Sequence, residues 1–378
     1  MTASPATNVR HHFATVADPR IDRTKAHDLL DIIVIALCAI VCGADSWVEV
    51  EDFGNAKLDW LRRFMPLPNG IPSHDTFGEV FARLDPTQFQ TSFLNWVRAV
   101  MEVTGGQVIA VDGKTLRRSH DHRLGKDAIH MVSAWASANR VVLGQIKVDE
   151  KSNEITAIPA LLQVLDLAGC IVTLDALGTQ KEIAQTIVDR EADYVLALKE
   201  NQGHLYEDVK ATFEDAEQHH FQAVPHDHHK TVTKDHGRLE IRQSWTISRA
   251  DYLEALRDHA VWPALHSIAM VRAERRIGDT TSVETRYYLS SLPGHAAQVL
   301  DAVRSHWGVE NGLHWCLDIA FREDESRVRK GEGAQNFAVL RHMALNLLKQ
   351  EKTAKVGIKA KRLKAGWDEA YLLKVLAE

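Results

Sequence analysis

The chain has 378 residues, 45% of them hydrophobic and 25% charged, with a formal net charge of −6. Such a composition is that of a globular protein, and its acidic balance argues against a protein that coats nucleic acid without sequence preference. The longest apolar stretch, residues 29–42, is too short to cross a bilayer, and the first residues lack the apolar core of a secretory signal. The four cysteines form no CxxC pair, which fits a reducing compartment, so we expect a cytoplasmic protein without membrane partners.

Residues 1–104 are predicted to form an N-terminal helical domain. Apolar residues recur at helical spacing in residues 27–43, 47–64 and 86–103. A loop rich in proline precedes Ser73, which we expect to cap a helix over residues 74–84. Gly105 and Gly106 mark the boundary to the next domain.

From Gln107 onward, short runs rich in β-branched and aromatic residues predict strands. Residues 106–113, 130–137 and 140–148 predict a three-stranded meander. Predicted helices and strands then alternate: a helix over 155–169, a strand over 170–176, a helix over 181–192 and a strand over 193–201. This order is typical of an α/β domain in which helices flank a mixed sheet, and we assign it residues 105–350.

Residues from about 203 to 292 are predicted to form a β-rich insertion in this domain. Residues 203–230 are polar and rich in histidine, and we interpret residues 217–230 among them as an exposed loop, although a Zn²⁺ or Ni²⁺ site is the alternative. Its histidines are His219, His220, His226, His228 and His229. Strand-like runs follow at 239–247, 266–277 and 282–292, helices return at 295–317 and 333–350, and residues 351–378 form a basic C-terminal segment.

Two apolar strand runs end on an aspartate, Asp112 and Asp175. A fully buried aspartate is rare unless it is paired or binds a metal, but an aspartate at the end of a strand also commonly caps the next turn. A right-handed crossover can place the two strands side by side with their ends together. The two carboxylates would then converge.

Glu310 is the third candidate carboxylate. Helical spacing puts it on one face with Val303, Trp307, His314 and Leu317, where an interfacial salt bridge is the alternative role. The rival acids Asp318, Glu323 and Asp324 follow it, the last two in a segment that we expect to be a charged, exposed loop. Three carboxylates fit Mg²⁺ or Mn²⁺, which prefer oxygen ligands and keep substrate phosphates in their coordination shell.

Two segments are locally basic, Lys114–Lys126 and Lys349–Lys364. Each can be a solvated surface or a site for phosphate groups. Because the first follows directly from Asp112, we predict that it lines the same cleft, and that the second adds a contact outside it. Trp307 and Trp315 are predicted to pack in the core rather than to stack on a base.

Several ordered motifs resemble those of bacterial insertion-sequence transposases of the DDE superfamily, in the group of H-repeat-associated proteins. They are VIAVDGKTLRRS, VTLDALGTQKEIA, DYVLALKENQ, HGRLEIR, HWGVENGLHWCLDIAFREDESRVR and NFAVLRHMALNLL, and the N-terminal GIPSHDTFGEVFARLDPTQF resembles the associated domain of that group. The resemblance implies a ribonuclease H-like catalytic domain and identifies Asp112, Asp175 and Glu310 as ligands of Mg²⁺ or Mn²⁺. It implies cleavage of element ends and strand transfer into target DNA.

The partners implied are double-stranded DNA, both terminal inverted repeats and target, and a second copy of the chain on that DNA, in the cytoplasm at the nucleoid. A catalytically silent DNA-binding remnant and a metal-dependent nuclease without strand transfer are the alternatives. The HGR motif can contact DNA or close a hairpin. The candidate phosphate contacts are Lys114, Arg117, Arg118, Lys199 and Arg238.

The sequence departs from the superfamily in one respect. Where the superfamily signature has a Tyr and an Arg before the catalytic Glu and a Lys after it, this chain has Val303, His306 and Leu317. The missing cations are expected to be replaced by basic residues nearby, and the candidates are Arg304, Arg327 and Arg329.

Overall fold

The computed structural model describes residues 9–100, 106–120, 127–148, 153–235 and 237–377. The N-terminal part is helical, as predicted, and Ser73 caps its helix by accepting a hydrogen bond from the backbone N–H of Thr76. Asp28 and Ser46 cap two further helices in the same way. The elements are α1 (Val9–Phe13), η2 (Asp22–Thr24), α2 (Leu29–Val41), α3 (Trp47–Ala56), α4 (Leu58–Leu61), α5 (His74–Arg83) and α6 (Pro86–Val100).

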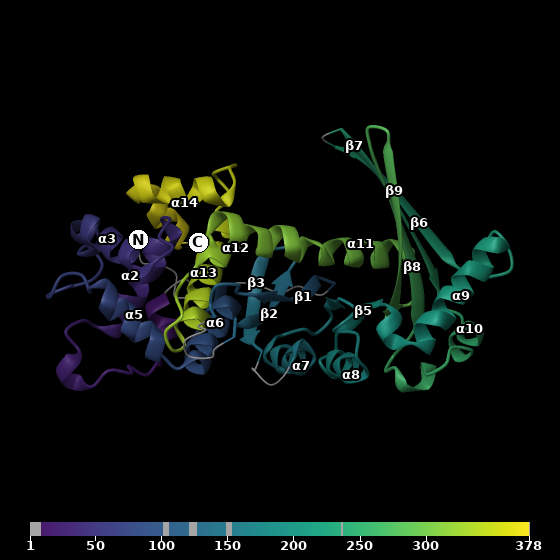
Figure 1. Ribbon diagram of the computed structural model, residues 1–378, viewed down its shortest axis with the longest axis horizontal. Coiled ribbons are helices and arrows are strands. Elements are labelled where there is room, and N and C mark those ends of the chain that lie inside the picture. The colour runs from purple at the N-terminus through teal and green to yellow at the C-terminus, as the bar shows by residue number, and fades with distance from the viewer. Residues whose placement is uncertain (1–8, 101–105, 121–126, 149–152, 236, 378) are drawn as a thin grey trace.

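The centre of the molecule is a mixed sheet flanked by helices, which confirms the predicted α/β class (Figure 1). The predicted meander forms as β1 (Val108–Thr115), β2 (His130–Ala136) and β3 (Val141–Lys147). On its other side β1 pairs in parallel with β4 (Ile171–Leu174), and β4 pairs in parallel with β5 (Asp193–Leu198). The crossover helices are α7 (Glu154–Val164) and α8 (Lys181–Asp189).

Strand alternation sends neighbouring side chains of β4 to opposite faces of the sheet. Val172 and Leu174 join the main core with α7 and α8, whereas Ile171 joins a separate buried cluster with Val299 and Val303 of α11 (Ala296–His306). The helix α11 therefore crosses the face opposite to α7 and α8, as Figure 1 shows. Any residue in phase with Ile171 points toward α11.

The β-rich insertion extends the same sheet and does not form a separate one. The whole sheet has nine strands in the order β3-β2-β1-β4-β5-β9-β8-β7-β6, and β9 joins it by antiparallel pairing with β5. The strands are β6 (Asp227–Asp235), β7 (Arg238–Ile247), β8 (Ser267–Ile277) and β9 (Thr280–Ser290). The short helix η3 (Glu200–Gln202) follows β5, and the short helices α10 (Ala250–Glu254) and η4 (His259–Val261) lie between β7 and β8.

The exposed loop predicted over residues 217–230 is confirmed for residues 219–226 and was wrong at both ends, which lie in a helix and a strand. A 15-residue helix, α9 (His204–Gln218), precedes this loop and takes its first two residues, and His228 and His229 lie in β6. Leu205, Val209 and Phe213 recur at helical spacing and are buried, so an apolar stripe was present among the polar residues. His236 of the HGR motif lies outside the described residues.

The predicted helix over residues 295–317 is interrupted. After α11, a π-helical turn, η5 (Glu310–His314), precedes α12 (Trp315–Ala320). This turn shifts the helical phase, and the two tryptophans are not core residues: the exposed fractions are 37% for Trp307 and 59% for Trp315. The prediction of core packing for them was wrong.

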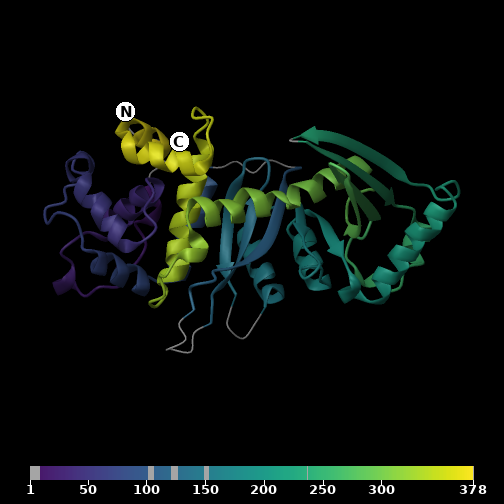
Figure 2. The same cartoon turned by 45° about the horizontal axis from the view of Figure 1, so that its top comes forward.

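The C-terminal helices pack against the N-terminal ones. They are η6 (Glu323–Glu325), α13 (Gly333–Gln350), α14 (Ile358–Trp367) and α15 (Glu369–Ala377), and α13 contacts α2, α5 and α6 (Figure 2). The basic C-terminal segment is thus only partly a free cationic surface, because Lys361 and Arg362 are buried. Within the described residues, no helix is both long and apolar enough to cross a membrane.

Candidate active site

The register of the sheet places Asp112 and Asp175 on the face that carries α11. Ala110 of β1 pairs with Thr173 of β4, so Asp112, two residues later, points to the same side as Thr173. Asp175 follows directly after β4 and continues the same alternation. Thr173 itself contacts the α11 helix, since its hydroxyl lies 3.0 Å from Nδ1 of His306. The two aspartates are therefore neighbours at one edge of adjacent parallel strands.

Both aspartates also make the local capping contacts that their positions suggest. Oδ1 of Asp112 accepts a hydrogen bond of 2.9 Å from the N–H of Gly113, and Oδ1 of Asp175 accepts one of 3.1 Å from Gly178. Each bond uses a single carboxylate oxygen. The capping role and a ligand role are thus compatible in each residue.

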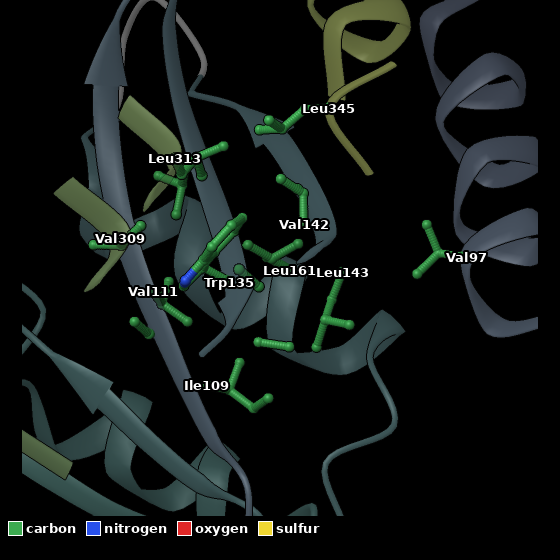
Figure 3. Close-up of a cluster of buried hydrophobic side chains, with 14 of the residues drawn as sticks. Val97, Ile109, Val111, Trp135, Val142, Leu143, Leu161, Val309, Leu313 and Leu345 are labelled. Atoms are coloured by element: carbon green, nitrogen blue, oxygen red, sulfur yellow. The ribbon is translucent and has the colours of Figure 1, made fainter. Parts of the chain in front are cut away.

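Glu310 reaches the same region from the helix that crosses the sheet. It is the first residue of the π turn, whose neighbours Val309 and Leu313 are buried and pack near Trp135 of β2 and Val111 of β1 (Figure 3). These apolar contacts anchor the turn while Glu310 stays exposed. π-helical turns are rare and often found at functional sites because they re-aim a side chain without ending the helix.

All three carboxylates line one cavity of about 830 Å³. Its lining includes Lys199 after β5, Arg286 of β9, and His306 and Trp307 of the crossing helix. The cavity lies where β1, β4, β5 and β9 meet α11, so it forms only after the insertion has joined the sheet.

The electrostatics of this cavity disfavour uncompensated charge on Asp112. Burial, together with the nearby carboxylates of Asp175, Glu154 and Glu310, raises the pKa of Asp112 to about 7, against the opposing effect of the Gly113 N–H. Among the described residues, however, no three His, Cys, Asp or Glu side chains stand close enough together to hold a metal ion as they are. The acids share a cavity but are not preassembled as a three-ligand cluster.

Residues 104–347 match the family described as "Transposase DDE domain", and residues 10–97 match the family described as "DDE_Tnp_1-associated". The chain belongs to the transposase DDE domain family. This confirms the resemblance of its motifs. The chain is 40% identical to "Putative transposase YncI" of Escherichia coli O157:H7, and the alignment covers 97% of this chain and 93% of the relative.

A second relative is "H repeat-associated putative transposase YhhI" of Escherichia coli strain K12, 40% identical with 97% of both chains covered. Among solved structures, a piggyBac transposase synaptic complex with hairpin DNA aligns with 98% of this chain and 78% of its own, at 12% identity and a TM-score of 0.43. A similarity of that degree does not establish a common fold.

The rival acids of the DDE domain lie outside the cavity lining and are engaged elsewhere. Nζ of Lys114 lies 2.5 Å from Asp318, 2.7 Å from Glu323 and 3.6 Å from Asp324. Glu323 is buried beside Arg341, so the expected exposed loop was wrong at this residue. Glu310 is thus the acid of this region that shares a cavity lining with Asp112 and Asp175.

The described part of the first basic segment does not line the cavity. The Lys114 side chain is only 12% exposed and is occupied by the three acids. Arg117 is exposed and pairs with Asp324 at 3.2 Å, and Arg118 is exposed. Arg123 and Lys126 lie outside the described residues. The prediction that residues 114–120 line the cleft was wrong, because β1 extends past Asp112 and carries them away.

The remaining predicted cations lie closer to the cavities. Lys199 is exposed in the lining of the carboxylate cavity, and Arg238 lines an adjoining one. Arg286 is a lining residue that the sequence analysis did not single out; its guanidinium carbon lies 4.2 Å from the ring centroid of Trp307. The alternation of Glu284, Arg286 and Tyr288 along β9 was the signal that could have found it.

The three residues that depart from the superfamily signature are placed differently in the structure. Val303 and His306 line the carboxylate cavity, while Leu317 is buried. Of the candidate replacements, Arg304 lines the adjoining cavity, and Nε of Arg329 donates to the backbone oxygen of Arg118. Burial lowers the pKa of His306 against the opposing effect of Asp175, which disfavours the cationic ring that could replace the missing arginine.

Proposed function

We propose that this chain is a metal-dependent DNA transposase that cleaves the ends of its element and joins them to target DNA. The observation that carries the proposal is that Asp112, Asp175 and Glu310 line one cavity in a member of the transposase DDE domain family. Lys199 and Arg286 supply positive charge in the same lining.

The fold that we infer for β1 to β5 is ribonuclease H-like. The support is the strand order β3-β2-β1-β4-β5, with the first three strands antiparallel and β4 and β5 parallel to β1. We infer domain boundaries of 1–104 for the helical domain, 105–350 for the catalytic domain and 351–378 for the C-terminal segment.

The residues fit Mg²⁺ or Mn²⁺ by chemistry, because all three are oxygen donors and Asp112 is held beside other carboxylates whose repulsion a cation would relieve. Asp112, Asp175 and Glu310 would hold the ions. When bound, such ions would activate the attacking oxygen and stabilise the leaving oxygen of a phosphodiester displacement.

The residues of the chain would position the two displacement steps. In the first, the oxygen of water bonds to phosphorus at the element end while the P–O3′ bond breaks, leaving a 3′-hydroxyl and a 5′-phosphate. In the second, that 3′-hydroxyl bonds to a target phosphorus and displaces the target's own 3′-oxygen. Lys199 and Arg286 would orient the reacting phosphodiester by charge.

The partners that we infer are the terminal inverted repeats and the target, both as double-stranded DNA. Two ends need two active sites, so we propose a homodimer on DNA. Bacterial DNA lies in the cytoplasm, and we propose that the protein acts there at the nucleoid.

The test is incubation with DNA that carries the element's own ends and with Mg²⁺, followed by analysis of cleaved and joined products. We expect both products from the wild type and neither from Asp112→Asn or Glu310→Gln, each of which removes a ligand charge at nearly constant shape. The control is Asp318→Asn, which should still cleave because Asp318 pairs with Lys114 outside the cavity lining.

The alternatives give different results in the same assay. A nuclease without strand transfer would yield cleaved ends but no joined product, and a silent remnant would bind DNA and yield neither. If Glu310→Gln cleaves at the wild-type rate while Asp318→Asn is inactive, the third ligand is Asp318 and the assignment of Glu310 is wrong.

A further inference from the structure

A second cavity, of about 620 Å³, adjoins the one that holds the carboxylates. The two share lining residues from β9 and from α11 and its end: Glu284, Arg286, Tyr288, Val303 and Trp307. They therefore form one continuous groove that runs from Asp112 onto the strands of the insertion. We call the part lined by Arg238, Glu240, Arg242, Arg275 and Arg304 the arginine groove.

Strand alternation explains why arginines gather there. Arg238, Glu240 and Arg242 alternate along β7, so all three point to one face of the sheet. The register pairs Glu240 with Arg275 of β8 and Arg275 with Ser282 of β9, which puts Arg286 in the same phase. That face is the one on which α11 packs, since α11 contacts β6, β7 and β8.

Glu240 holds three of these arginines in place. It is only 8% exposed, and its carboxylate lies 2.8 Å from Nε of Arg238 and 3.2 Å from Nη2 of Arg275, and accepts a hydrogen bond from Nη2 of Arg242. Burial alone would raise the pKa of Glu240, but the arginines outweigh it and lower that pKa. A single buried carboxylate thus faces three guanidinium groups.

The arrangement leaves cationic donors to spare. A guanidinium has five N–H donors, and each arginine spends only one or two of them on Glu240. The lining of this second cavity has five arginines against three glutamates in a chain whose net charge is −6. Two of those glutamates also have arginine partners: Glu284 pairs with Arg286 and Glu274 with Arg276. The fixed charge and the planar fork fit phosphate oxygens.

We propose that the arginine groove binds the phosphate backbone of the DNA strand that leaves the carboxylate cavity, and that Glu240 is the positioning residue that preorganises Arg238, Arg242 and Arg275 for it. This rests on the proposed function for the identity of the polymer. Arg286, held on the face of Trp307, stands at the junction of the two cavities and completes the path.

The sharpest test compares two adjacent arginines of β8. Arg275 and Arg276 have side chains that are both 52% exposed, and both pair with a glutamate, but they point to opposite faces, and only Arg275 is in the groove lining. We expect Arg275→Ala to weaken binding to duplex DNA of the element end and to reduce the slope of log affinity against log salt by about 0.9. Arg276→Ala should leave the slope unchanged.

The affinity is measured without divalent metal across a salt series, so the result does not depend on cleavage. Equal salt slopes for Arg275→Ala and Arg276→Ala would contradict the proposal that the arginine groove binds DNA. If the wild type does not cleave but the two alanine variants still differ in slope, the proposed chemistry is wrong and the proposed DNA binding by the groove stands. Arg275→Lys should keep the slope but bind more weakly, because lysine retains the charge and loses the fork.

Glu240→Gln separates a positioning role from simple electrostatics. The substitution makes the groove more positive, so a groove that acted through net charge alone would bind DNA more tightly. We expect binding about tenfold weaker instead, because the arginines lose their charged anchor. Glu240→Asp, which keeps the charge, should recover part of the loss. Tighter DNA binding by Glu240→Gln would refute the positioning role. The role would also be refuted if Glu240→Gln and Glu240→Asp bound DNA with equal affinity and unfolded at the same lowered temperature.

Discussion

Lys114 follows Asp112 by two residues and turns its ammonium group inward, to Asp318, Glu323 and Asp324. Burial works against the charge of Glu323, but Lys114 and Arg341 lower its pKa, so Glu323 stays ionised in the interior. A buried carboxylate left without its partner is costly, which assigns Lys114 to stability and weakens the expectation that it contacts phosphate.

We predict that Lys114→Met lowers the free energy of unfolding by about 3–5 kcal/mol, because it removes the cation that three buried or partly buried acids share. Chemical denaturation measures this, and the salt slope of DNA binding should not change. The control is Lys330→Met: Lys330 pairs with Glu79 on the surface, so the loss should stay within about 0.5 kcal/mol. A stable Lys114→Met variant whose salt slope falls by a full unit would instead make Lys114 a phosphate contact.

At the scale of elements, the π turn between α11 and α12 decides where Glu310 points. The turn sits on Trp135, and Gly312 allows this close approach because a Cβ there would lie 2.9 Å from Cζ2 of the indole ring. Trp135 is fully buried, so the ring cannot move away cheaply. The position of the third carboxylate thus depends on a glycine two residues further along the chain.

Gly312→Ala should therefore shift the turn and reduce cleavage, with a loss of stability of about 1–3 kcal/mol from overpacking. DNA affinity should stay near that of the wild type, because Gly312 lies in neither cavity lining. Gly308→Ala is the matched control: its Cβ would lie 3.9 Å from the same indole, an ordinary contact, so it should cleave normally. Equal cleavage by both variants would mean that the turn does not set Glu310.

At the scale of the whole molecule, the C-terminal helices α13 and α14 pack against the N-terminal helix α2. Arg362 of α14 is buried and donates hydrogen bonds to the backbone oxygens of Ile40 in α2 and Ala44 after it, and to the carboxylate of Asp45. Glu351, at the end of α13, accepts a hydrogen bond from the Tyr371 hydroxyl of α15 and pairs with Lys361 of α14. Arg362 therefore helps to connect the C-terminal helices to the N-terminal ones, and Glu351 connects α13, α14 and α15 to one another.

Stability should depend on the ionisation of Glu351. Burial would raise its pKa, but hydrogen bonds from Thr353, Tyr371 and Ala354 outweigh burial and lower the pKa to about 2. A depressed pKa contributes stability that is fully present above the unfolded value near 4.5 and is lost as pH falls through about 2. At about 1.4 kcal/mol per unit, the contribution is on the order of 3 kcal/mol.

The measurement is the free energy of unfolding of the wild type and of Glu351→Gln across this pH range. We expect a constant difference above pH 4.5 and convergence of the two curves as pH falls toward 2. Curves that stay parallel to the acid end would mean that Glu351 is not ionised in the folded protein.

The sequence alone was enough to predict most of the elements and to single out all three candidate acids, Glu310 by its helical spacing. Strand and helix order follow from local hydrophobic periods, and the position of an acid at the end of an apolar run is a local fact, so Asp112 and Asp175 stood out without any contact being known. The N-cap at Ser73 and the α/β class were predicted correctly for the same reason.

Only the tertiary structure decided what each charge does. Lys114 and Arg286 are both cations near strand acids, yet one is paired inside the protein and the other lines the cavity, because strand phase and the path of α11 set which face each residue meets. The arginine groove brings together residues of β7, β8, β9 and α11, and no local sequence pattern predicts that these elements lie side by side. Sequence periodicity fixes which residues share a face of an element; which face covers which depends on contacts between residues far apart in the chain.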